Sequence, residues 1–119
     1  MTFVQKRDKL THLLKSAEIN EIFYSKNSLP SALPAAIVTL ANRTGTGQVD
    51  FCYAEQKYKF EVLLVTDDTE NADLLLLDTI EIIDNQMQQA LHTAIDTTEF
   101  YDSLLNAKSI KIAKFEVLL

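Results

Sequence analysis

Hydrophobic residues recur every three or four positions at the beginning of the chain, which is the spacing of an amphipathic helix. Thr2 precedes this stripe and belongs to the residue types that cap helix N-termini. The pattern therefore predicts a helix from Thr2 to Ala17, with the basic side chains mostly off the stripe. The stripe consists of Phe3, Leu10, Leu13, Leu14 and Ala17, with Val4 beside it.

Two prolines, Pro30 and Pro34, lead into the short apolar run Ala35–Leu40. Proline fixes φ, lacks an amide donor and biases the preceding residue toward extended geometry. Because the run is apolar on both faces, we expect a strand that is central or covered on both sides. The preceding segment Ile19–Tyr24 fits a short extended piece or an irregular turn.

Two alternating segments follow a polar loop that contains Gly45 and Gly47. The first is Val49–Ala54. The second is Lys57–Val65, where apolar and charged side chains alternate with the period of two that a strand requires. The two residues between these segments are too few for a crossover, so the pattern predicts an antiparallel hairpin. One face of the second strand carries Tyr58, Phe60, Val62 and Leu64.

A long helix is predicted over Ala72–Leu91, with one apolar face and one acidic face. The apolar face consists of Leu76, Ile80, Ile83, Met87, Ala90 and Leu91. Leu74, Leu75 and Leu77 widen the apolar sector at its N-terminal end. A sector this wide predicts burial on two sides, so we expect these three leucines to form a subunit interface.

The end of the chain contains Thr97–Leu105, which fits a short helix with Phe100, Leu104 and Leu105 inward, and a final strand, Ser109–Leu119. The alternation of this strand changes phase at Ile112–Ala113, which predicts either a change of buried face or a bulge. The fold class is therefore α+β in a single domain, residues 1–119. We expect a mixed, largely antiparallel sheet of about four to five strands, flanked by an N-terminal helix and one long acidic helix. The predicted core is Leu10, Leu13, Ile37, Phe60, Val62, Ile80, Ile83, Met87, Phe115 and Val117.

Charge is distributed unevenly along the chain, whose net charge is −6. Residues 66–106 carry ten acidic and no basic residues, whereas the segments on both sides are weakly basic. A stretch without Lys or Arg does not neutralise phosphates, so we expect no tight nucleic-acid binding through it. The acidic stretch fits a solvated helix face, a surface that repels DNA, or one that meets a basic partner.

Candidate chemistry is sparse. His12, His92 and Cys52 have no partner at a metal-ligand or nucleophile spacing,. The acids around Asp67 lack the glycine and terminal glutamate of a calcium loop and fit helix capping instead. The loop that contains Gly45 and Gly47 lacks the lysine of a phosphate-binding loop. We therefore expect no enzyme, no metal and no cofactor. The loop is expected to be a mobile hairpin tip that orders on assembly, comprising Arg43, Thr44, Gly45, Thr46, Gly47 and Gln48,.

Compartment signals are also few. The charged N-terminus does not fit a signal peptide, and no apolar run is long enough for a membrane span,. The single cysteine fits a reducing cytosol.

The order of these elements resembles the tail terminator proteins of long-tailed bacteriophages, the lambda-like siphophage group. The resemblance spans nearly the whole chain and includes related neck and tail-completion proteins. It rests on the N-terminal helix, on Leu-Pro-Ala-Ala-Ile-Val-Thr-Leu at 33–40, on the loop at 42–48, on Tyr-Lys-Phe-Glu-Val-Leu-Leu-Val at 58–65, on the helix Ala-Asp-x(4)-Asp-x(4)-Ile-x(3)-Met at 72–87, and on Ile-Lys-Ile-Ala-Lys-Phe-Glu-Val-Leu-Leu at 110–119.

The resemblance implies a structural virion protein of a phage or prophage, assembled in the host cytoplasm. Such proteins form a homohexameric ring that caps the tail tube, stops its growth and provides the surface that joins the head. The implied partners are the major tail tube protein and a head–tail connector or head-completion protein. DNA would pass through the lumen without specific binding. The alternatives are another neck component, or a small bacterial ligand-binding or regulatory domain with a pocket between helix and sheet.

Overall fold

The computed structural model describes residues 2–45 and 56–119. Within these residues, five strands form one sheet in the order β1-β2-β3-β5-β4. β1 and β2 are parallel, and the other neighbouring pairs are antiparallel. The fold is therefore α+β with a mixed, mostly antiparallel sheet, as predicted. The elements are α1 (Phe3–Ser16), β1 (Glu21–Phe23), β2 (Ala35–Thr44), β3 (Lys57–Asp67), α2 (Ala72–Leu91), β4 (Thr98–Leu105) and β5 (Lys108–Leu118).

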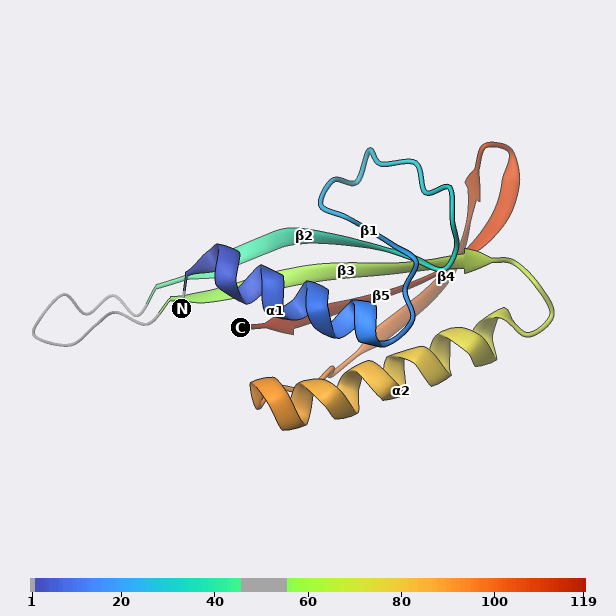
Figure 1. The fold of residues 1–119 in the computed structure, drawn as a ribbon. Coiled ribbons are helices and arrows are strands. Elements are labelled where there is room, and N and C mark those ends of the chain that lie inside the picture. Colours follow the sequence, from blue (N-terminus) through green and yellow to red (C-terminus); the bar gives the residue numbers. More distant parts are fainter. Residues whose placement is uncertain (1, 46–55) are drawn as a thin grey trace, which may run out of the picture.

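Both helices cover the same face of the sheet, and the connection from β1 to β2 lies on the opposite side (Figure 1). On the helix-covered face, Leu10 of α1 and Ile83 of α2 belong to one buried cluster with Phe60 of β3. The ring of Phe3 lies parallel to that of Phe60, with centroids 5.5 Å apart. All ten residues predicted to form the core are buried.

Helix α1 begins as its sequence predicts. The Thr2 side chain accepts a hydrogen bond from the Gln5 amide, and the Gln5 side chain accepts one from the Thr2 amide. This capping box satisfies two amide donors that the first turn would otherwise leave unpaired. Helix α2 has the predicted bounds, and its C-terminal cap, His92, adopts the left-handed conformation with φ 53°,.

The phase change in the last strand reflects two cores on opposite faces of the sheet. β5 pairs with β3 without a register shift from Leu118 to Ile110. Phe115 and Val117 face the helices, whereas Ile110 and Ile112 form a second cluster with Val65 on the other face. The buried face therefore changes without a bulge, because the second cluster covers the other side of the strand there.

The prediction of a helix at Thr97–Leu105 is wrong, because Thr98–Leu105 is strand β4 and pairs with β5 throughout its length. The turn between them is Asn106-Ala107, whose φ angles are 52° and 62°. Two consecutive residues with positive φ are typical of the type I′ turn, whose twist matches that of a hairpin. Phe100 and Leu104, expected to point inward, are exposed.

β2 is longer than predicted and extends through Thr44. Asn42 and Thr44 pair with Lys59 and Lys57 after a bulge that follows Leu40, so the first residues of the predicted loop belong to the sheet. Among the described residues β3 lies between β2 and β5. Its predicted hairpin partner, Val49–Ala54, lies outside the described residues, so that pairing stays a prediction.

Candidate assembly surface

Helix α2 exposes the three leucines predicted to form an interface. The exposed fractions of Leu74, Leu75 and Leu77 are 64%, 56% and 44%, and Ile82 is 48% exposed. The buried stripe of the same helix runs through Ala72, Leu76, Ile80, Ile83 and Met87. The helix therefore packs one face on the sheet and leaves large apolar side chains in solvent. Their role as an interface remains a prediction.

The three leucines belong to two different sides of α2. Leu75 borders a small cavity together with Ile19 and Pro34, on the side of the α1–β1 connection. Leu77 follows Asp73 by four residues, and positions four apart lie on the same side of a helix. Leu74 is three residues before Leu77, so these two leucines are neighbours and Leu75 is separate from them.

Lys111 of β5 links this side of α2 to strand β4. Its ammonium lies 3.2 Å from a carboxylate oxygen of Asp102 in β4 and 3.4 Å from one of Asp73 in α2. The hydrogen bond to Asp102, and then that to Asp73, raises the pKa of Lys111 above its usual value of 10.5. The start of α2 and the middle of β4 are therefore held to the same lysine.

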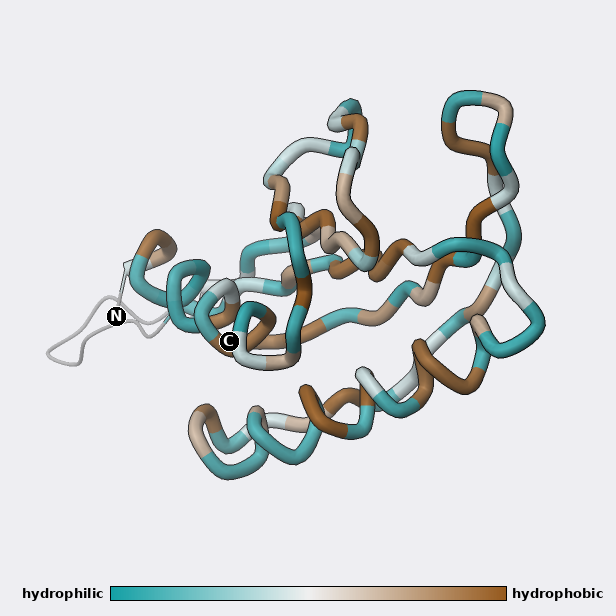
Figure 2. The backbone as a smooth tube through the Cα atoms, turned by 45° about the vertical axis from the view of Figure 1, so that its right-hand side comes forward, coloured by the Kyte–Doolittle hydropathy of each residue, from teal (hydrophilic) through white to brown (hydrophobic). Residues whose placement is uncertain are grey.

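Phe100 lies beside this ion-pair network on β4. Alternate residues of a strand share a face, so Phe100 and Leu104 lie on the same side as Asp102. The exposed fraction of Phe100 is 40%, and that of Leu104 is 69%. We call Leu74, Leu77 and Phe100 the α2–β4 surface, because Asp73 and Asp102 bring them to one side of the molecule. Figure 2 shows hydrophobic segments along the first half of α2 and near the tip of the β4–β5 hairpin.

Sequence reasoning missed the β4 part of this surface because it placed Phe100 and Leu104 on the inner face of a helix. The apolar pairs Phe100-Tyr101 and Leu104-Leu105 recur four residues apart, which is a helical spacing rather than the alternation of a strand,. The available signal for a hairpin was the Asn residue at the turn before the final strand.

The predicted assembly loop is only partly within the described residues. Arg43 and Thr44 belong to β2, and the Arg43 Nε donates a hydrogen bond to the Gln56 side chain at 3.1 Å. A Cβ added at Gly45 would meet no heavy atom within 4 Å. Thr46, Gly47 and Gln48 lie outside the described residues, so the mobility of the loop stays a prediction.

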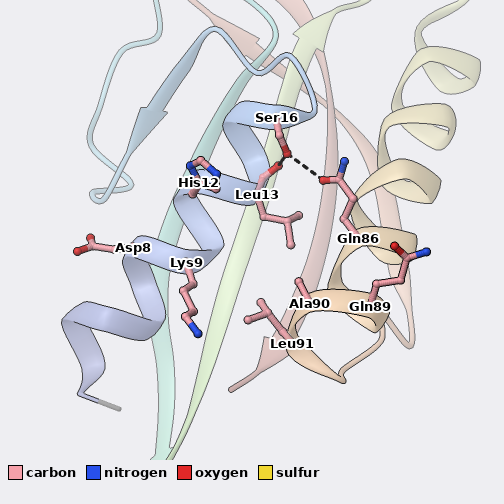
Figure 3. A pocket seen from close by; sticks show the side chains of 9 residues that line it. All are labelled: Asp8, Lys9, His12, Leu13, Ser16, Gln86, Gln89, Ala90 and Leu91. Atoms are coloured by element: carbon pink, nitrogen blue, oxygen red, sulfur yellow. Dashed lines mark hydrogen bonds between the residues drawn. The ribbon is translucent and has the colours of Figure 1, made fainter.

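A groove of about 700 Å³ separates the C-terminal halves of the two helices (Figure 3). Leu13, Ala90 and Leu91 give it apolar walls, and His12 and Lys9 stand at its α1 side. The Ser16 hydroxyl donates to the Gln86 side chain at 2.9 Å and connects the helices at one end. The groove therefore offers mainly apolar contact with a few polar groups at the rim.

The sheet face opposite the helices carries a partly buried carboxylate. The Glu61 side chain is 12% exposed and lies 2.9 Å from Lys26 and 3.8 Å from Lys114. The hydrogen bond to Glu61 raises the pKa of Lys26 above 10.5. Because Lys26 belongs to the connection between β1 and β2, this ion pair fastens that connection to the sheet.

The described residues show no group of three His, Cys, Asp or Glu side chains that could hold a metal ion. Within the same part of the chain, neither helix has the length and apolar character needed to cross a membrane. Neither protein-family models nor curated proteins give a match to this sequence.

Proposed function

We propose that this chain is a structural phage virion protein that forms a homohexameric ring on the end of the tail tube, as the tail terminators it resembles do. The ring would stop growth of the tube and present the surface that joins the head. The observation that carries the proposal is the α2–β4 surface, where Leu74, Leu77 and Phe100 are each exposed and Lys111 pairs with both Asp73 of α2 and Asp102 of β4.

A clustered apolar surface favours self-assembly. Single exposed apolar residues are normal on a monomer, whereas a group of them marks a contact with another molecule. Burial releases about 25 cal/mol for each square ångström of apolar area, so a repeated contact around a ring accumulates considerable free energy. Leu74 and Leu77 keep their exposure although α2 already buries a complete stripe on the sheet.

The distribution of charge fits a passage for DNA. Lys108 pairs with Asp67, and Lys111 pairs with Asp73 and Asp102, so several acids next to the hairpin are balanced. Asp78 and Glu81 of α2 remain exposed. Acidic residues repel phosphates, which allows DNA to pass a ring without sticking. The proposed partners are the tail tube protein on one side and a connector protein on the other.

The proposal is tested by the mass of the assembly and by its effect on tail tubes. Light scattering after size-exclusion chromatography should give a hexamer, either for the free protein or after mixing with purified tail tubes. Electron microscopy should show one added ring at the tube end and no further growth when tube subunits are supplied. A protein that stays monomeric at high concentration and leaves tube growth unchanged contradicts the proposal.

Another neck component is separated from a terminator by its binding target. A terminator binds isolated tail tubes, whereas a head-completion protein binds connector rings and leaves tubes free. Pull-down of the chain with each particle distinguishes the two.

A small ligand-binding domain is the second candidate, and the groove between α1 and α2 favours it. A concave, mainly apolar site with a few polar groups is the usual form of a small-molecule site. Under this reading the free chain stays monomeric or dimeric, and a small apolar molecule raises its melting temperature. Ala90→Trp fills the groove and should remove that shift, while ring formation should be unaffected.

A further inference from the structure

The sheet has two exposed edges whose lengths match. β4 is the outermost strand on one side, and Glu99 to Leu104 are exposed along it. On the other side, β1 covers only Ala35–Ile37 of β2. In the described part of the chain, no strand pairs with the outer edge of β2 beyond Ile37. Unpaired edges of this kind are templates for pairing with another chain.

The strand directions allow these edges to pair between identical copies. Along the sheet β2, β3, β5 and β4 alternate in direction, because each neighbouring pair is antiparallel. β4 therefore runs opposite to β2. When one copy is placed beside another in the same orientation, β4 of the first meets β2 of the second as an antiparallel pair.

Side chains on the two edges match in one register. Leu40 and Arg43 pair with Phe60 and Tyr58, so the bulge brings both to the helix-covered face. Leu104 and Asp102 lie on the same face of β4. Antiparallel pairing sets the exposed Leu40 opposite the exposed Leu104 and Arg43 opposite Asp102. Apolar pairs and opposite charges are the cross-strand pairs that stabilise a sheet.

We propose that β4 of one copy adds to the outer edge of β2 of the next copy, with Leu40 facing Leu104 and Arg43 facing Asp102. This inference deepens the proposed ring and rests on it, since it names the contact that joins the subunits. The occupant of each edge is a second copy of this chain, because the two edges complement each other in direction, polarity and charge. The contact is head-to-tail, as a ring requires.

The pairing shifts successive copies along the strand direction. Within one molecule, Leu40 lies across the sheet from Val117 of β5, because both pair with Phe60 of β3. Leu104 pairs with Ser109 of β5, which is eight residues before Val117. At the rise of a strand this is about 26 Å. Closed barrels have tilted strands with such a stagger, so the shift fits a ring of tilted strands.

Disulfide trapping tests the contact. Leu40 and Leu104 are replaced by Cys in one chain, with Cys52→Ser to remove the native thiol. Within one molecule β3 and β5 separate the two positions, so a bond between them must join two copies,. Oxidation should give a ladder of covalent species that ends at six subunits. The matched control, Leu29→Cys with Leu104→Cys, should give no ladder, because Leu29 is more exposed than Leu40 but lies in the β1–β2 connection.

The outcomes separate this contact from the proposed function. Absence of a ladder from a protein that light scattering shows to be hexameric overturns the strand pairing and leaves the ring. A ladder without an upper limit supports the pairing and overturns the closed hexamer. Crosslinks within the Leu40→Cys variant alone show a symmetric contact and overturn the head-to-tail arrangement. A monomeric wild-type protein that ignores tail tubes overturns both proposals.

Charge reversal gives a second, independent measurement. Arg43→Glu should raise the concentration at which half of the chains are assembled by about tenfold, as expected for replacing attraction by repulsion across a strand pair. Lys15→Glu makes the same change in net charge on the exposed side of α1 and should leave this concentration unchanged. Equal effects of the two variants contradict the pairing of Arg43 with Asp102.

Discussion

Leu40 and Phe60 are cross-strand partners in β2 and β3, yet Phe60 is completely buried and Leu40 is 48% exposed. The side chain of Phe60 is covered by the ring of Phe3 from α1. On β2 the cover that the helices provide therefore ends between Val38, which is 2% exposed in the same buried cluster, and Leu40. An apolar residue on the helix-covered face remains open to solvent at the sheet edge, and this is where another chain gains most from binding.

The α2–β4 surface is tested by Leu74→Lys and Leu77→Lys. Both positions are exposed, so each variant should fold with an unchanged melting temperature, fail to form hexamers and fail to terminate tails. Leu75→Lys is the matched control, because Leu75 lies on the other side of α2 and should still allow assembly. Normal rings from both variants, measured by light scattering, show that this surface is not an interface.

The helix phase is tested by two neighbouring residues. Ile83 is completely buried, so Ile83→Ala should lower the free energy of unfolding by about 2–5 kcal/mol,. Ile82 is 48% exposed, and Ile82→Ala should change the free energy of unfolding by no more than about 0.5 kcal/mol,. Urea denaturation of both variants provides the comparison. Similar values for the two contradict the observed orientation of α2.

The link through Lys111 is tested by Lys111→Met. Its pKa is raised in the folded state, so its ion pairs contribute stability below pH 10.5 that is lost as pH rises through the folded pKa,. The variant should therefore lose less stability than wild type on alkaline titration. It should also show faster amide exchange in β4 and at the start of α2. Lys15→Met, on the exposed side of α1, should leave the exchange of β4 unchanged.

The connection from β1 to β2 is tested at Glu21. The Ser31 hydroxyl and amide donate to its carboxylate, and the hydroxyl bond is the larger reason why the pKa of Glu21 is below 4.5. A lowered pKa contributes stability above pH 4.5 that is lost as pH falls through the folded value. In Ser31→Ala the pKa of Glu21 should rise toward 4.5 in an NMR titration. An unchanged titration contradicts the contribution of Ser31.

Much of the fold is predictable because burial leaves a periodic record in the sequence. The apolar stripe from Leu76 to Met87 predicts α2 and its bounds correctly, because one face of that helix packs on the sheet. β4 left no such record, because most of its side chains are exposed. Its spacing also fitted a helix, and only the pairing with β5 decides between the two structures.

The candidate site was partly predictable for the same reason. Leu74, Leu75 and Leu77 stood out as leucines in excess of what one packed face needs. The structure divides them between two sides of α2, one near Lys111 and the other near Pro34. Both of these residues are distant from the leucines in sequence, so the division could not be predicted. The open edge of β2 was hidden because its last residues were read as a loop.

The position of β5 has a consequence for synthesis of the chain. β5 follows the other four described strands in the sequence and leaves the ribosome after them, yet it lies between β3 and β4 in the sheet. Until Phe115 and Val117 are available, Phe60 and Val62 lack their partners, and β4 has no neighbour to pair with. Chains released before β5 would expose an apolar strand edge and aggregate readily. Only subunits whose β5 has been synthesised thus become competent to assemble.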